Sequence, residues 1–234
     1  WVHNSDKGTW KYYGDEEEPK LHTGWFQAVP SKELNSNDHE NGTTHWYYAN
    51  SKGEITIPTA DGEVGVVKTI DGKSYLFNSD GEMVTGLRIL TYDGSKITNI
   101  SSEVDSADTV KNMNSDTMKL VYFESNGAAK TGTTTITLDG TSYTFSFKSN
   151  GSPRGVGETG ISDGYIYQNG LRLTADEDTK YGVVTYKNES YVVNEKGSIQ
   201  KNKKNLKDAD ETYYCTNAKG ILLHSSTEKC TTKH

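Results

Sequence analysis

Apolar and aromatic residues alternate with polar ones over short stretches of the chain, and most of these stretches end in a small polar run and a glycine. The pattern reads WYYANSKG, YLFNSDG, VYFESNG and YTFSFKSNG, then YIYQNG, YVVNEKG and YYCTNAKG, with final glycines at Gly53, Gly81, Gly127, Gly151, Gly170, Gly197 and Gly220. Side chains two positions apart point to one face of a strand, so Tyr75 and Phe77 share a face, as do Tyr165 and Tyr167. A recurrence of roughly two dozen residues indicates a repeat architecture.

The polar runs predict tight turns. Asp80-Gly81, Asn126-Gly127, Asn150-Gly151 and Asn169-Gly170 are dipeptides that favour positive φ in hairpins. A second glycine often follows, as at Gly86, Gly132 and Gly155, where we expect the return strand to end. An isolated hairpin is marginal in water, so each must bury its aromatic face against its neighbours. We therefore predict an all-β fold, an elongated β-hairpin repeat array (β-solenoid-like) with two irregular insertions; a globular sandwich for part of the chain is the alternative.

Two segments lack the repeated pattern. Residues 31–45 and 93–117 are rich in Ser, Asn and Asp, which indicates insertions or long surface loops. Inside the second segment, apolar residues recur every three positions and favour one short amphipathic helix: Val104, Ala107, Val110 and Met113. The predicted division is residues 1–92, with Trp-containing hairpin repeats, residues 93–117, an insertion or long loop, and residues 118–234, with Tyr-rich repeats.

Composition narrows the functional classes. Only 32% of the residues are hydrophobic, too few for the thick core of a typical two-layer enzyme, whereas fifteen tyrosines argue against disorder. The net charge of −7 repels nucleic-acid phosphates, so no nucleic-acid partner is expected. No apolar run is long enough to cross a bilayer, so no membrane span is expected. The chain does not open on a signal peptide, and we take it for either a mature fragment or an excised piece of a longer protein.

Motifs for catalysis or metal binding are weak. Cys215 and Cys230 form either one disulfide or two free thiols. His39 and His45 flank a polar loop without a cysteine or carboxylate pattern of metal spacing, so no metal site is expected. Residues 155–160 spell G-x-G-x-x-G, but a strand-like stretch follows in place of the helix that a dinucleotide requires. We therefore expect no catalytic residues, no cofactor and no enzymatic activity.

Several stretches together resemble the cell-wall-binding and glucan-binding (choline-binding-like) repeats of Gram-positive surface proteins. They are Thr23-Gly24-Trp25, Trp46-Tyr47-Tyr48, Asn78-Ser79-Asp80-Gly81 and Thr85-Gly86. The resemblance implies a non-catalytic module of a secreted or cell-surface protein of the Gram-positive wall. Its partner would be a polysaccharide or cell-wall polymer, with or without choline substituents. In choline-binding members, rings of adjacent hairpins surround a quaternary ammonium through cation–π attraction. Carried onto this chain, the ligand-binding residues are Trp10, Tyr12, Trp25, Trp46 and Tyr48.

The chain departs from that pattern after Trp46. No tryptophan follows, and Gly86-Leu87 and Gly132-Thr133 replace the expected Gly-Trp pair. We therefore favour carbohydrate or wall polymer over a full ladder of choline cages, since tyrosine rings flanked by polar groups suit sugars. The alternative is an adhesin or toxin-like receptor-binding region that binds a host protein through its insertions. A hydrolase has the least support.

Overall fold

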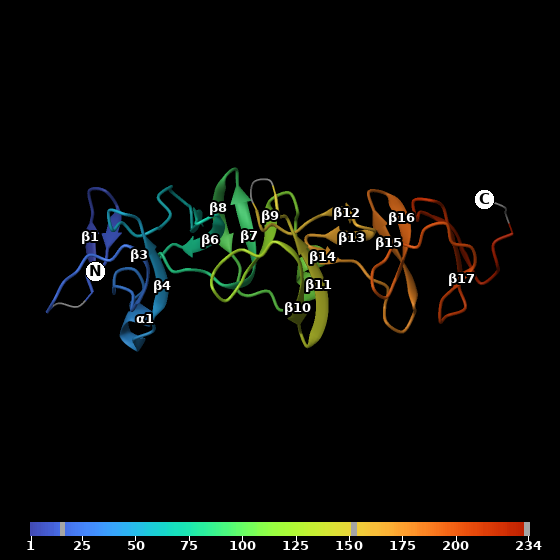
Figure 1. The fold of residues 1–234 in the computed structure, drawn as a ribbon, viewed down its shortest axis with the longest axis horizontal. Helices are drawn as coiled ribbons and strands as arrows, with labels where there is room; N and C mark the ends of the chain where they lie inside the picture. The colour runs from blue at the N-terminus through green and yellow to red at the C-terminus, as the bar shows by residue number, and fades with distance from the viewer. Residues whose placement is uncertain (15–16, 151–153, 232–234) are drawn as a thin grey trace. The chain divides into compact units, whose positions relative to one another are not determined.

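The computed structural model describes residues 1–14, 17–150 and 154–231 (Figure 1). The predicted turn glycine Gly151 lies outside the described residues. The chain divides into two compact units, which are treated separately below. Unit 1 comprises Trp1–Asp105, Met113–Thr131 and Ser149–Val156; unit 2 comprises Ser106–Asn112, Gly132–Lys148 and Gly157–His234.

Unit 1 is built from antiparallel hairpins. It contains two two-stranded sheets, β1-β2 and β3-β4, and one five-stranded sheet of order β6-β5-β8-β7-β9. Its elements are β1 (Val2–Asn4), β2 (Thr9–Lys11), β3 (Gly24–Ala28), α1 (Ser36–Asn41), β4 (His45–Ala49), β5 (Gly65–Ile70), β6 (Lys73–Asn78), β7 (Gly86–Asp93), β8 (Lys96–Ile100) and β9 (Met118–Phe123).

Unit 2 follows the same plan. Its three sheets have the orders β10-β11-β14-β13-β12, β15-β16 and β17-β18-β19. The elements are α2 (Ala107–Asn112), β10 (Gly132–Leu138), β11 (Thr141–Phe147), β12 (Gly160–Ser162), β13 (Tyr165–Gln168), β14 (Leu171–Arg172), β15 (Tyr181–Tyr186), β16 (Glu189–Asn194), β17 (Leu206–Lys207), β18 (Tyr213–Thr216) and β19 (Leu222–Ser226). The predicted all-β hairpin fold is confirmed, with two six-residue helices in the described part of the chain.

One turn recurs five times along the chain. In each copy the glycine N–H donates to the carbonyl three residues earlier, over 2.7 to 3.0 Å, at Gly53, Gly81, Gly127, Gly197 and Gly220. Each of these glycines has a positive φ, between 76° and 87°. In four copies the first residue is asparagine, and its side-chain oxygen accepts from the residue after the glycine, as Asn78 does from Glu82 over 2.8 Å. This asparagine-to-glycine turn is the structural repeat.

The repeats are joined through what we call the return residue, the second residue after the turn glycine. Return residues pair with the strand before the turn at Ile55, Met83, Ala129 and Ile199. Each also donates its backbone N–H to an earlier strand or turn; Met83, for example, donates to the Trp46 carbonyl over 2.9 Å. The side chains of Ile55, Met83 and Ile199 lie where a Cβ would stand on the next turn glycine, at Gly81, Gly127 and Gly220. Glycine is therefore needed there for its conformation and for space.

Among the residues that the structure describes, three clusters of buried side chains form cores. Unit 1 has a cluster of Trp10, Phe26, Ala28, Tyr47, Ala49 and Ile55, and a second of Leu76, Leu90, Ile97, Val121, Phe123 and Val156. Unit 2 has a cluster of Ile166, Ala175, Tyr191, Val193 and Ile199. Most of these residues are aromatic or β-branched, and about half of them come from the alternating stretches.

The two segments expected to be loops are more ordered than predicted. Helix α1 forms inside residues 31–45, capped by Asn35, whose side chain accepts from the Asp38 N–H over 3.1 Å. In the second segment, Lys96–Ile100 forms β8 in the middle of the five-stranded sheet, which the polar composition had hidden. The short helix predicted there is confirmed as α2, which contains Ala107 and Val110. These two residues and the flanking Val104 and Met113 are all buried. The predicted boundaries after residues 92 and 117 stay a prediction.

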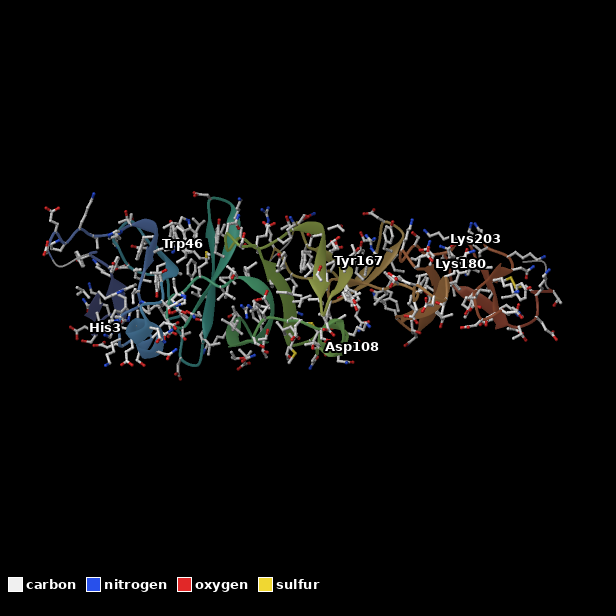
Figure 2. The ribbon with its side chains drawn as sticks, turned by 90° about the horizontal axis from the view of Figure 1, so that it is seen from below. His3, Trp46, Asp108, Tyr167, Lys180 and Lys203 are labelled. Carbon is white, nitrogen blue, oxygen red and sulfur yellow. A yellow bond between two sulfur atoms is a disulfide. The ribbon has the colours of Figure 1, made fainter. Side chains whose placement is uncertain are left out.

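Cys215 and Cys230 are joined in a disulfide, drawn in yellow in Figure 2. The bond ties β18 to the end of the described chain, so of the two possibilities left open the paired state holds. None of the described helices is long and apolar enough to cross a membrane.

Candidate functional site

The β3–β4 hairpin has two distinct faces. Phe26 and Tyr47 point inward and are buried, at 7% and 0% exposure. Trp25 is opposite Tyr48 across the hairpin, and Gln27 is opposite Trp46. Because side chains alternate along a strand, these four residues share the other face. Sequence alternation thus gives this hairpin one core face and one face rich in aromatic groups.

Trp25 is the centre of a ring cluster on that face. Its ring centroid lies 5.1 Å from that of Tyr48 and 4.7 Å from that of Tyr75, both edge-on. Phe77, fully buried, stacks on it at 5.8 Å. Tyr75 and Phe77 come from the next hairpin, β5–β6. Trp25, Tyr48 and Tyr75 are half-buried, so each ring is both held by its neighbours and open to solvent. We call these three residues the Trp25 cluster.

Lys68 places a positive charge on the Trp25 cluster. Its Nζ lies 5.4 Å from the centroid of the Tyr48 ring, within range of a cation–π interaction. Lys68 is also the cross-strand partner of Tyr75. An internal cation therefore already contacts the cluster.

Trp46 lies on the same face as Trp25 and Tyr48, and it is the most exposed of the predicted site residues (Figure 2). Its exposed fraction is 43%, a large apolar area in contact with solvent. Exposed indoles are common at binding surfaces, because one large ring offers much contact area.

Trp10 and Tyr12 lie against the core of the first hairpins. Trp10 is buried and stacks on His3, with ring centroids 4.2 Å apart. The Tyr12 ring lies 4.9 Å from Trp1 and stacks on Phe26 at 5.2 Å. The structure thus brings Trp25 and Tyr48 together and leaves Trp10 and Tyr12 in another cluster. The ligand role predicted for Trp10 and Tyr12 stays a prediction.

Two residues of the site were not predicted, Tyr75 and Lys68. Tyr75 was recognised only as one of the alternating strand aromatics. Lys68 sits in Val66-Val67-Lys68, where alternation marks it as the polar side of a strand and gives no sign of a ring beneath it. Register across the β5–β6 hairpin is what places both residues beside Trp25 and Tyr48.

A second ring pair with its own cation lies in unit 2. The Arg172 guanidinium carbon is 3.8 Å from the Tyr165 ring centroid and 5.5 Å from that of Tyr167. Its Nη2 donates to the Tyr167 hydroxyl over 2.9 Å (Tyr167 is labelled in Figure 2). This contact fixes Arg172 over the pair, so the two tyrosine faces are already occupied.

A cavity of about 820 Å³ in unit 1 lies beside the second insertion. It is open to solvent and lined by Val66, Val67, Tyr92, Asp116, Lys119 and Arg154, among others. The lining also includes Glu63, so one aromatic ring stands with two acidic and two basic side chains, which suits a polar ligand or a protein surface.

His45, at the start of β4, lies beside two carboxylates. Its Nε2 is 2.9 Å from Asp38 Oδ2 and 3.6 Å from Glu82 Oε1. The sequence showed no carboxylate pattern of metal spacing around His45, because Glu82 comes from a distant turn that no local spacing reveals. The expectation of no metal site stays a prediction.

The chain matches no protein-family model and no curated protein. Solved structures do match. One is CbpJ from Streptococcus pneumoniae TIGR4, with a TM-score of 0.53 and 18% identity over 95% of this chain. Another is choline binding protein F from Streptococcus pneumoniae, with a TM-score of 0.53 and 19% identity over 96% of this chain. The chain spans 57% of the length of each. This chain therefore has the β-hairpin repeat fold of pneumococcal choline-binding proteins.

Proposed function

We propose that this chain is a non-catalytic module of a secreted or cell-surface protein, and that it binds carbohydrate or a cell-wall polymer. The observation that carries the proposal is the Trp25 cluster, whose three half-buried rings are contributed by two adjacent hairpins. Exposed Trp46 and Gln27 on the same face extend the surface available to a long ligand.

Sugar rings suit this surface for a chemical reason. The C–H face of a pyranose is apolar and packs on an aromatic ring, while its hydroxyls bind polar groups at the rim. Gln27 offers both an amide donor and an acceptor at that rim. A polymer can contact the Trp25 cluster and Trp46 at once, which adds affinity without a deep pocket.

Choline is the competing ligand class, since the structural matches are choline-binding proteins. Lys68 argues against it as the main ligand at the Trp25 cluster. A quaternary ammonium would stand close to the Lys68 Nζ, which is 5.4 Å from the Tyr48 centroid, and like charges repel. A neutral sugar suffers no such repulsion, and an anionic wall polymer is attracted.

The test is affinity gel electrophoresis of the chain with wall polysaccharide, with α-glucans and with choline-bearing wall material. We expect retardation by one of the first two and an affinity at least about tenfold lower in Trp25→Ala, because a central aromatic anchor carries much of the binding free energy. Tyr143→Ala, a half-buried tyrosine of unit 2, is the matched control and should bind normally.

Retardation that Trp25→Ala and Tyr143→Ala reduce equally would contradict the proposal, as would the absence of retardation by every polymer. Circular dichroism of each variant separates loss of the site from loss of the fold.

A second candidate function is binding of a host protein through the insertions. The cavity beside the second insertion favours it, because Lys119 and Arg154 present positive charge there beside Tyr92. Deleting residues 93–117 would remove β8 from the sheet, so substitution is the better test. Lys119→Glu with Arg154→Glu should abolish protein binding and leave polymer binding unchanged, whereas Trp25→Ala should do the reverse.

A further inference from the structure

His45, Asp38 and Glu82 bring three potential metal ligands together from separate elements. Asp38 belongs to α1, His45 begins β4, and Glu82 follows the turn after β6. One ligand atom from each residue lies within 4.8 Å of the other two. Helix α1 is held in position by its own cap at Asn35, so Asp38 faces His45 without a contribution from any ligand.

The cluster has an excess of negative charge. Glu82 is only 8% exposed, and within the described residues the ion pairs of Asp38 and Glu82 are with His45. Asn35 and Asn78 amides donate to these carboxylates over 2.9 to 3.0 Å, which neutralises no charge. Burying carboxylates without a cation is costly, so this site favours a bound positive ion.

Tyr47 supplies an independent observation. Its side chain is 0% exposed, and its hydroxyl has no hydrogen-bond partner within the described residues. Tyr47 is two positions after His45 and therefore points to the same face of β4. An unpaired buried hydroxyl costs about 1 to 3 kcal/mol, which an ion-bound water or a direct ligand contact would offset.

We propose that His45 Nε2, Asp38 Oδ2 and Glu82 Oε1 bind a divalent transition-metal ion of the Zn²⁺ type. Ligands about 2.0 to 2.1 Å from a tetrahedral ion are about 3.4 Å from one another. The 2.9 Å and 3.6 Å separations around His45 Nε2 bracket that value. An imidazole ligand favours Zn²⁺ over Ca²⁺ or Mg²⁺, which prefer oxygen ligands.

The residues around the three ligands also favour a metal site. The Asn35 amide donates to both ligand carboxylates, the kind of outer contact that orients metal ligands. A cavity of about 490 Å³ lined by His45, Asn78, Ser79 and Glu82 gives the ion a route from solvent. The bound ion would tie residues 31–45 to the turn after β6.

The test is calorimetric titration of the full chain with ZnCl₂ after chelator treatment. We expect one ion per chain, and at least about tenfold weaker binding in His45→Ala and in Glu82→Gln. His224→Ala, which removes a histidine on β19, is the matched control and should bind Zn²⁺ normally.

Nuclear magnetic resonance of the wild-type imidazoles keeps the test decisive even if a variant unfolds. Zn²⁺ should shift the His45 ring signals and leave those of His224 in place. Absence of stoichiometric binding, a shift confined to other histidines, or Ca²⁺ or Mg²⁺ binding as tight as Zn²⁺ would each overturn the proposal.

Discussion

The glycine of the asparagine-to-glycine turn is required for two reasons, its backbone conformation and the lack of space for a side chain. At Gly197, φ is 80°, a conformation that residues with a Cβ adopt only at a cost. A Cβ at this position would also lie 2.8 Å from the Leu173 carbonyl oxygen, a backbone atom that cannot move aside easily. Gly81 and Gly127 were recognised from sequence because D-G and N-G dipeptides favour tight turns. The turn glycines that follow lysine, Gly53, Gly197 and Gly220, were recognised from the recurrence of the pattern. The asparagine that begins four of the turns was missed, because its role depends on a hydrogen bond four residues along the chain.

Two glycine variants separate the cost of the left-handed backbone conformation from the cost of crowding at the Cβ position. Gly140 has a similar φ of 75° but has open surroundings at its Cβ position. We expect Gly140→Ala to lower the free energy of unfolding by about 1 to 2 kcal/mol, the cost of a left-handed conformation. Gly197→Ala should lower it by a further 1 to 3 kcal/mol, roughly, through overpacking. Urea unfolding measures both, and equal effects would contradict the predicted crowding.

The proposed function predicts that Lys68 sets the ligand class of the Trp25 cluster, because its Nζ lies 5.4 Å from the Tyr48 ring centroid. In Lys68→Met the ring surface is kept and the competing charge is removed. We therefore expect affinity for choline or tetramethylammonium to rise by on the order of tenfold, and affinity for a neutral glycan to stay within about threefold. Fluorescence titration of the wild type and the variant measures this. A fall in choline affinity would show that Lys68 does not oppose the cation.

Strand β8 shows why some elements cannot be predicted from the sequence pattern. Of its five residues only Ile97 is buried, and the neighbours Thr98 and Asn99 are exposed. The stretch therefore looks like a polar loop, although the Val64 N–H donates to the Ile97 carbonyl over 2.8 Å and ties β8 to the chain before β5. The α2 helix was predictable because four of its flanking and internal positions follow a helical spacing.

Ile97 tests whether the second insertion is part of the fold. It is 3% exposed and belongs to the core cluster of unit 1 with Leu76 and Phe123. Ile97→Ala should lower the free energy of unfolding by about 2 to 5 kcal/mol. Asn99→Ala, on the exposed side of the same strand, should change it by less than about 0.5 kcal/mol. Thermal and urea unfolding of the two variants check this, and similar small effects would mean that the insertion is a dispensable loop.

The three-stranded sheet β17-β18-β19 contains a buried tyrosine that makes its stability depend on pH. The Tyr214 hydroxyl donates to Asp208 Oδ2 over 2.7 Å, and burial, with the Asp208 contact, raises the Tyr214 pKa to about 12. The unfolded chain loses this proton near pH 10, so the folded state binds more protons between pH 10 and pH 12. Stability should therefore fall across this window. In Tyr214→Phe the free energy of unfolding should fall less steeply with pH, whereas Tyr213→Phe, on the same strand, should leave the pH dependence unchanged. Urea unfolding midpoints measured at several pH values test this.

At the scale of the whole molecule, stability is divided among local clusters. Each of the three core clusters draws its side chains from one unit, and the disulfide closes a segment with a sequence separation of 15. Reducing the disulfide should cost about 3 kcal/mol by the chain-entropy argument for a loop of that length. In an array of repeats the loss should be local.

Hydrogen exchange measures that locality. After reduction, β17, β18 and β19 should lose protection, and the β3–β4 hairpin should keep it. An equal loss of protection in the β17-β18-β19 sheet and in the β3–β4 hairpin would mean that the whole chain unfolds cooperatively.

The limits of prediction also differ by scale. Recurring glycines and alternating rings sufficed for the hairpin fold, because they act within a few residues. Trp25 and Tyr48 were found through a resemblance, yet their neighbours Tyr75 and Lys68 depend on the register between strands. The place of Glu82 beside His45 depends on the joint between successive hairpins, where the Met83 N–H donates to the Trp46 carbonyl, and no pattern near His45 encodes it.

The return residue has a consequence for how such a gene changes length. Ile55 and Ile199 each donate a backbone N–H to an earlier strand or turn and place a side chain on the next turn glycine. Suppose that a DNA segment is duplicated in frame from one return residue to the next. The inserted hairpin then meets the same kind of strand or turn at each of its two ends. Recombination in this way would add or delete whole hairpins while the backbone hydrogen bond of each joint is kept.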